Sequence, residues 1–410
     1  MKGLCAVMLL QPGVDKRFVK RAVEILRAVT DRLELVQGAE IESCRSNECS
    51  AILVLFMGLA NESLLKLLGS CGKPMAFVGH SRYSSLSTLL QALRAAPGKM
   101  IAAFYSADLD PGVVDRAVRY LSAVSYLRGY RLGVLGEEAD VPPWLMPDRH
   151  RVEQVLGVEL FEVPFEELVE EYAVSSQPTK ILERVVGGAT TVGVDQRSLE
   201  AALRLYTALL AIARRYELRG ILVPCRRVME EIGTSACIAA ALMNDVGVDV
   251  ECELDPVAGL SMAVMRAVAQ GPCFVGRVSH VHGGRVVLSR CSAPISMSSG
   301  YAIRRPLGAE LGAALSADLV PGRSVTALFL EPELRRGLVV RGYVLSGRPE
   351  VPYLCRSQLT LATESAELYR VLEGLRVHKL AVAFGNHAPV LSQLLRALGM
   401  EVIEVPNHRS

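Results

Sequence analysis

The chain has 410 residues, half of them apolar and 21% charged, which is enough apolar material for two or three buried cores. A net charge of +2 and an aromatic content of 5% offer neither a basic surface nor a stacking platform, so we expect no nucleic-acid partner. The longest apolar run, residues 51–60, is about half of the roughly 20 residues that span a bilayer, so we expect no membrane partner.

The ten cysteines show neither a framework spacing nor a C-x-x-C pair. That distribution predicts reduced thiols in a cytoplasmic protein. Arginine outnumbers lysine and side-chain amides are sparse, which favours a thermophile source. Hyperthermophile cytosols tolerate disulfides, so the argument from thiols to compartment is weaker in that case.

The first third of the chain alternates apolar runs with helical patterns. Strands are predicted at residues 3–10, 51–58 and 73–80, and helices at 15–33 and 61–70. A second series begins with a strand at residues 98–106 and a helix at 110–129. It continues through a strand at 130–135, a long helix at 198–218, a strand at 220–225 and a helix at 234–247. This alternation predicts two Rossmann-like units with parallel sheets.

Beyond residue 271 the pattern changes to short β-rich runs separated by glycine and proline, as in residues 283–291, 323–331 and 335–347. Such runs predict antiparallel strands in a small barrel or sandwich. The end of the chain returns to strand, helix and strand. We therefore predict an α/β fold with three domains: residues 1–96, residues 97–270, and a β-rich, mostly antiparallel domain at 271–410.

Residues 248–262, VDVECELDPVAGLSM, place carboxylates at one strand-to-helix junction. Pro256 suits the first turn of a helix, and Asp255 before it is a natural N-cap. Glu251 lies within the strand and points at water or at a neighbouring arginine. Glu253 follows the carboxyl end of the strand, where open α/β sheets bind ligands. A solvated turn is the alternative interpretation of Glu253.

A second junction has the same order of features. Residues 379–399 run from a strand through a Gly-Asn-His turn into a helix with a proline in its first turn. The histidine, His387, lies at a helix N-terminus, where the dipole favours the neutral imidazole that a metal needs. A packing role is the alternative, and spacing alone does not show that His387 and Glu253 meet in space.

The sequence around these junctions resembles the L-fucose/L-arabinose isomerase superfamily. The main match is residues 224–262, and residues 131–145, 286–297 and 353–359 add weaker ones. The late Asn386-His387 pair resembles the Asn-His of the same family. The matching positions in the main segment are Cys225, Thr234, Cys237, Ala241, Leu242, Asn244, Asp245, Gly247, Cys252, Glu253 and Asp255.

The resemblance implies an aldose–ketose isomerase, an intramolecular oxidoreductase of carbohydrate metabolism that forms homo-oligomers and uses a divalent ion, commonly Mn²⁺. It implies that Glu253 binds the metal and moves the proton, and that His387 is a second metal ligand. The metal would stabilise the developing ene-diolate. Asn386 and Arg290 are then candidates for contact with the substrate.

Two positions depart from the family pattern. Gly276 stands where the family has an acidic ligand, and Arg290 stands where it commonly has a histidine. One carboxylate and one imidazole hold a hard divalent ion poorly. His280 and His282 are candidates to complete the site, or else form a solvated hairpin tip beside a Gly-Gly turn.

Arg290 has two interpretations: it recognises an acidic group on the substrate, or it lies exposed on a strand. Cys225 and Cys252 are either reactive thiolates near helix N-termini or buried, inert cysteines. The leading functional hypothesis is therefore a sugar isomerase. The alternative is a relative that binds a carbohydrate or sugar acid without isomerising it, and a third is another reaction on sugar acids.

Overall fold

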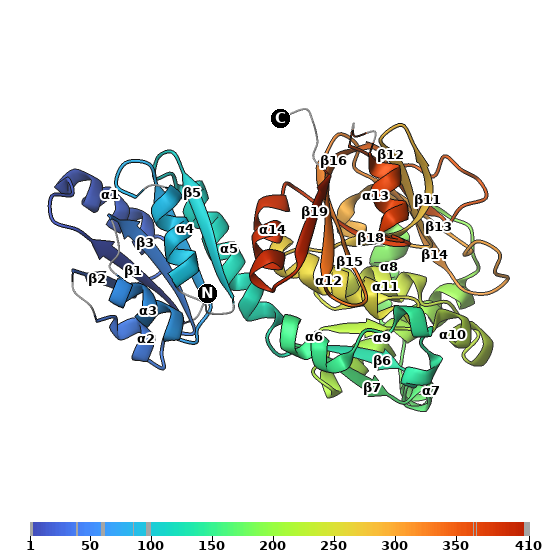
Figure 1. Ribbon diagram of the computed structural model, residues 1–410. Coiled ribbons are helices and arrows are strands. Elements are labelled where there is room, and N and C mark those ends of the chain that lie inside the picture. Colours follow the sequence, from blue (N-terminus) through green and yellow to red (C-terminus); the bar gives the residue numbers. More distant parts are fainter. Residues whose placement is uncertain are drawn as a thin grey trace. The chain divides into compact units, whose positions relative to one another are not determined.

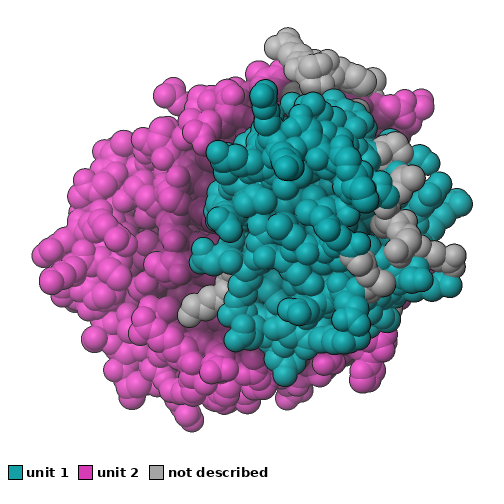
Figure 2. Space-filling view, turned by 90° about the vertical axis from the view of Figure 1, so that its left-hand side faces the viewer, with its two compact units in different colours: residues 1–126, 389–400 teal, residues 127–388, 401–410 magenta. Residues whose placement is uncertain are grey.

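The computed structural model describes residues 3–37, 40–58, 62–84, 86–95, 100–363, 365 and 367–405. Their contacts divide the chain into two compact units, which Figure 2 distinguishes by colour. Unit 1 comprises Met1–Tyr126 and Pro389–Met400, and unit 2 comprises Leu127–Ala388 and Glu401–Ser410. Each unit is described separately.

Unit 1 is built on a parallel five-stranded sheet in the order β2-β1-β3-β4-β5 (Figure 1). Its strands are β1 (Leu4–Leu10), β2 (Leu33–Val36), β3 (Ala51–Met57), β4 (Met75–His80) and β5 (Ile101–Ser106). Its helices are α1 (Lys16–Arg27), α2 (Glu42–Arg45), α3 (Glu62–Ser70), α4 (Leu86–Ala95), α5 (Pro111–Leu127) and α14 (Ala388–Ala397). Every residue of β3 is buried, as expected for a parallel strand with both faces covered. The expected start of the second helix, Asn61, lies outside the described residues.

Strand β5 belongs to the sheet of unit 1, whereas the sequence places it in the second domain. It pairs with β4 from Met75↔Ile101 to His80↔Ser106 and so extends the first sheet. The apolar pattern of a strand does not specify which sheet it joins, because any parallel edge offers the same hydrogen bonds.

Two disulfides in unit 1 show that the expectation of reduced thiols is wrong for four of the cysteines. Cys5 is bonded to Cys49, and Cys44 is bonded to Cys71. The sequence separations of 44 and 27 residues match no recognisable framework, so only the fold brings these cysteines together.

Unit 2 begins with a parallel four-stranded sheet in the order β10-β9-β6-β7. Its strands are β6 (Tyr130–Leu135), β7 (Val158–Val163), β9 (Gly220–Leu222) and β10 (Asp249–Glu251). The helices of this part are α6 (Arg149–Leu156), α7 (Phe165–Val174), α8 (Thr179–Gly187), α9 (Gln196–Arg215), α10 (Cys225–Glu231), α11 (Cys237–Asp245) and α12 (Pro256–Ala269). Asp255 caps α12 by accepting from the backbone N–H of Ala258 (3.0 Å), which confirms the predicted cap.

A larger sheet follows in the order β15-β18-β11-β12-β17-β16-β19, and an extra pairing between β15 and β16 closes six of its strands into a barrel-like ring (Figure 1). The strands are β11 (Phe274–His282), β12 (Arg285–Arg290), β15 (Ser324–Leu330), β16 (Arg336–Ser346), β17 (Ser357–Ala362), β18 (Lys379–Phe384) and β19 (Glu401–Val405). All of its pairings are antiparallel except that between β16 and β19. The α13 helix (Leu368–Gly374) lies between β17 and β18 in the chain.

A three-stranded sheet joins the two parts of unit 2. It has the order β14-β13-β8, with β8 (Ala189–Val192), β13 (Ser298–Arg304) and β14 (Ala314–Leu319). One apolar core extends from Leu135 to Val405, so residues 127–388 pack as one unit without a division at 270.

The α/β class and the mostly antiparallel C-terminal half are confirmed. Whether the parallel sheets belong with Rossmann-like folds stays a prediction. No helix among the described residues is both long and apolar enough to cross a bilayer.

Candidate functional site

The site forms around a cavity of about 900 Å³ in unit 2, a size typical of small-molecule sites. It lies where β10 ends and α12 begins, next to the end of β12 and the start of β18. Glu253 and Asp255 from the predicted junction line it, together with Arg290. The cavity also brings in Lys379 and His378, which lie more than 120 residues away along the chain.

Glu253 extends into this cavity with 37% of its side chain exposed. Its carboxylate lies 2.5 Å from the Lys379 ammonium, 4.0 Å from the Arg290 guanidinium and in hydrogen-bond contact with Arg277. Burial alone would raise the pKa of Glu253, but the charges of Lys379 and Arg290 outweigh it and lower the pKa to about 2. Glu253 is therefore ionised at neutral pH and a weak base.

Lys379 is enclosed by carboxylates. Its Nζ lies 2.9 Å from Glu251, 2.5 Å from Glu253 and 2.8 Å from Asp255, and only 4% of its side chain is exposed. Burial would lower the pKa of this ammonium, but the charges of Glu251 and Asp255 raise it. Lys379 is thus a fixed cation at the point where three carboxylates converge.

Asp255 joins the cluster while it caps α12. Its carboxylate accepts a hydrogen bond from His378 Nε2 at 2.7 Å, besides its contact with Lys379. Burial would raise the pKa of Asp255, but His378 and Lys379 together hold it well below its usual range. The Asp255 carboxylate therefore both caps α12 and lines the cavity.

Arg290 is buried rather than exposed on its strand, with 9% of its side chain accessible. Its Nη2 donates to the Glu251 carboxylate at 2.6 Å and to the Cys252 sulfur at 3.0 Å. Glu251 accepts a hydrogen bond from Arg290, which agrees with one of its two interpretations. The Glu251 side chain is buried, so it does not point at water. Counting Arg277 and Lys379 with Arg290, three cations balance the charges of Glu251, Glu253 and Asp255.

This balance bears on the divalent ion that the resemblance implies. A metal needs carboxylate oxygens with lone pairs directed at a common point. Here the Lys379 ammonium holds that point. Among the described residues, no group of three or more His, Cys, Asp or Glu side chains is arranged to hold an ion. The three carboxylates are paired with protein cations, and the divalent ion stays a prediction.

His387 lies at the other end of β18 from Lys379. A six-residue strand separates its ends by roughly 16 Å. The His387 Nε2 donates to the carbonyl oxygen of Phe384 at 2.8 Å, and its backbone N–H donates to Thr326 Oγ1 at 2.9 Å. The ring covers Gly385, where an added Cβ would come within 2.8 Å of Nε2. Neither His387 nor the exposed Asn386 is among the residues that line the cavity.

The other sequence candidates lie apart from the cavity. His280 and His282 are exposed on β11 beside the Gly283-Gly284 turn. Gly276 is packed so tightly that an added Cβ would lie 2.6 Å from Leu288 Cβ, which leaves no room for an acidic side chain.

The sequence did not single out three of the charged or titratable cavity residues that contact Glu253 and Asp255: Lys379, His378 and Arg277. A signal for the first was available, because a lysine opens the otherwise apolar strand LAVAF, where an unpaired charge is costly. Trp144 is the only tryptophan of the chain, and it lines the cavity with 75% of its surface exposed. Cys225 and Cys252 line the cavity too, and burial raises the pKa of the Cys252 thiol to about 12.

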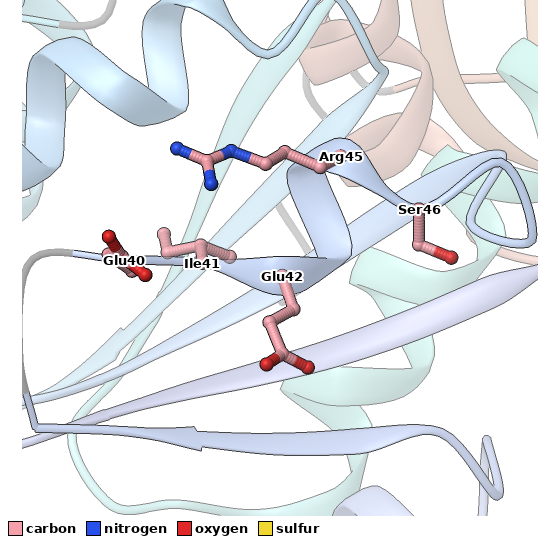
Figure 3. A pocket seen from close by; sticks show the side chains of 5 residues that line it. All are labelled: Glu40, Ile41, Glu42, Arg45 and Ser46. Carbon is pink, nitrogen blue, oxygen red and sulfur yellow. The ribbon is translucent and has the colours of Figure 1, made fainter.

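Unit 1 contains a smaller cavity of about 270 Å³, lined by residues 40–42, 45 and 46 (Figure 3). The figure shows the side chains of Glu42 and Arg45 pointing in different directions from the one-turn helix α2. Among the described residues that line it, Glu42 and Arg45 do not point toward a common centre, so we take the cavity of unit 2 as the candidate site.

The chain matches no protein-family model and no curated protein.

Proposed function

We propose that the chain binds a sugar or a sugar acid in the cavity at Glu253 without isomerising it. The observation that carries this proposal is the contact of Lys379 with three carboxylates. These carboxylates are engaged by a protein cation, and the pKa of about 2 leaves Glu253 a weak proton acceptor. Binding therefore accounts for the geometry better than proton transfer does.

The lining of the cavity suits a polyhydroxylated ligand. Glu253 offers acceptor oxygens, and the guanidinium of Arg277, whose side chain is 58% exposed, offers donors within reach of solvent. The exposed indole of Trp144 provides an apolar face for the C–H groups of a sugar ring. A carboxylate on the ligand would be recognised by Arg277, which supports the sugar acid as a ligand.

Fluorescence of Trp144 tests this proposal, because no other tryptophan contributes to the signal. Neutral aldoses, ketoses and the matching aldonates are titrated separately, and we expect a saturable change with at least one of them. Glu253→Gln should weaken binding, while Glu310→Gln, an exposed acid outside the cavity, should not. The proposal fails if the whole panel changes neither the fluorescence nor the melting temperature.

An aldose–ketose isomerase is the second candidate, favoured by a carboxylate and an ammonium in contact within a cavity. Glu253 would move the proton between carbons one and two, and Lys379 would stabilise the negative oxygen. The test is ketose formation from aldoses with and without added Mn²⁺, beside metal analysis of the purified protein. Turnover that disappears with Glu253→Gln would favour the enzyme, and stoichiometric Mn²⁺ would favour the metal site that the resemblance implies.

We further propose a homo-oligomer in the cytoplasm of a thermophile. The resemblance supports the first property, and the preference for arginine supports the last. Light scattering on the purified protein gives the oligomer number, and a monomer at micromolar concentration would contradict it.

A further inference from the structure

The cavity at Glu253 is also rich in thiols. Six cysteines are free, and five of them line this one cavity: Cys225, Cys237, Cys252, Cys291 and Cys355. The sixth, Cys273, is buried and does not line it. Free cysteine often packs as an inert apolar residue, but these five gather around one cavity that also holds charged groups, and this concentration calls for a chemical explanation.

Four of these thiols interact with one another. The Sγ atoms of Cys291 and Cys355 are 3.7 Å apart, which is van der Waals contact. Cys237 interacts with both Cys291 and Cys225. Cys225, Cys291 and Cys355 are partly exposed, whereas Cys237 is buried. The pair that small oxidants reach most easily is therefore Cys291 with Cys355.

The backbone already places this pair for a bond. Cys291 follows β12 directly, and Cys355 lies two positions before the first residue of β17. These strands are antiparallel neighbours whose register ends at Arg290↔Ser357, so the two cysteines leave adjacent strand ends. A disulfide needs about 2.05 Å between sulfurs, so the two Sγ atoms must approach each other from 3.7 Å.

The surroundings shift the pKa values of the two cysteines in opposite directions, which favours a thiolate at Cys291 and a thiol at Cys355. Interaction with Cys237, and then with Cys355, holds the pKa of Cys291 well below its usual range, and the charge of Arg290 acts in the same direction. The interaction with Cys291 raises the pKa of Cys355. A thiolate beside a protonated thiol is the combination with which disulfide formation begins.

We propose that Cys291 and Cys355 form a reversible disulfide when the protein meets a hydroperoxide. The Cys291 thiolate attacks the distal peroxide oxygen, so that an S–O bond forms and the O–O bond breaks; the leaving alkoxide or hydroxide takes a proton from solvent and departs as an alcohol or water. The Cys355 thiol then attacks the sulfenic sulfur, an S–S bond forms and water leaves. The two sulfurs lose two electrons in total to the peroxide, and a dithiol reductant reverses the reaction.

The experiment exposes the intact protein to hydrogen peroxide, blocks remaining thiols by alkylation and maps the peptides without reduction. We expect a crosslinked peptide joining positions 291 and 355 that disappears with dithiothreitol. Cys5–Cys49 and Cys44–Cys71 are present before treatment and serve as internal references. The outcome does not depend on a sugar ligand, so it is separable from the test of the proposed function.

Variants keep the result interpretable. In Cys237→Ser/Cys355→Ser the sulfenic acid of Cys291 loses both neighbouring thiols, and dimedone should label position 291 in at least tenfold excess over the wild type. Cys273→Ser, a buried thiol outside the cavity, should leave the crosslink unchanged. The proposal is overturned if all six free thiols still alkylate after peroxide, or if Cys291 becomes linked to Cys237 instead of Cys355.

Discussion

The chain has the same local sequence pattern after β10 as after β18, but the two junctions lie in different surroundings. Each strand passes through a polar turn into a helix with a proline in its first turn. At the first, Glu253 extends into a cavity and meets three cations. At the second, the His387 ring turns back onto the carbonyl of its own strand. Strand-end position therefore does not make a site by itself, because a site also needs complementary groups from distant segments.

The largest expected effect comes from removing the central cation of the first junction. Lys379→Met would leave Glu251, Glu253 and Asp255 without their shared partner. Breaking a buried ion pair in this way costs about 3–5 kcal/mol in the free energy of unfolding. Denaturant titration measures the loss, and adding Glu251→Gln in the same chain should recover part of it.

The same variant tests whether Lys379 occupies the position that a metal ion would take among Glu251, Glu253 and Asp255. With the ammonium gone, the three carboxylates lose the cation at the point where they converge, so we expect Lys379→Met to bind Mn²⁺ and the wild type not to. Electron paramagnetic resonance of free Mn²⁺ reports the binding. Equal binding by both proteins would mean that Lys379 does not compete with a metal for this position.

The next effect is on ligand affinity. Glu253→Gln removes the charged acceptor in the cavity, and a hydrogen bond to a charged group contributes about 1.5–3 kcal/mol, or roughly 10- to 100-fold in affinity. The Trp144 fluorescence titration gives the ratio of dissociation constants. An unchanged affinity would place the ligand away from Glu253.

A pH dependence should follow from the lowered pKa of Glu253. Its folded-state pKa of about 2 lies below the usual 4.5, so its charge stabilises the fold fully above pH 4.5. That contribution is lost as the pH falls from 4.5 toward 2. The melting temperature should decrease across this window in the wild type and decrease less in Glu253→Gln, as followed by circular dichroism. Parallel curves would show that the carboxylate is not stabilised by Lys379.

The smallest effect is expected at the second junction. His387→Ala removes a hydrogen bond to Phe384, worth about 1 kcal/mol, and should leave sugar affinity unchanged. Thermal unfolding and the fluorescence titration measure the two quantities. A fall in affinity like that of Glu253→Gln would restore the role that the resemblance implies for His387 and remove the contrast between the junctions.

Local sequence was a good guide to local structure at the first junction. The run from β10 to α12, with Asp255 as cap and Pro256 in the first turn, follows from steric and hydrogen-bonding preferences of adjacent residues. The partners of Glu253 do not, because Arg277, Arg290 and Lys379 come from three strands of a different sheet. Their meeting depends on the pairing of β11 with β18 on one side and with β12 on the other, which no periodicity within one strand specifies.

By itself the sequence determined the α/β class, the antiparallel C-terminal half, the cap of α12 and the presence of an acid at the end of β10. These depend on contacts between residues close in the chain, where period and residue type are sufficient. Only the tertiary structure decided that a lysine lies among the acids, that Gly276 has no space for a side chain and that Cys291 touches Cys355. Each of these depends on a contact between different segments of the chain, which packing sets and local pattern does not.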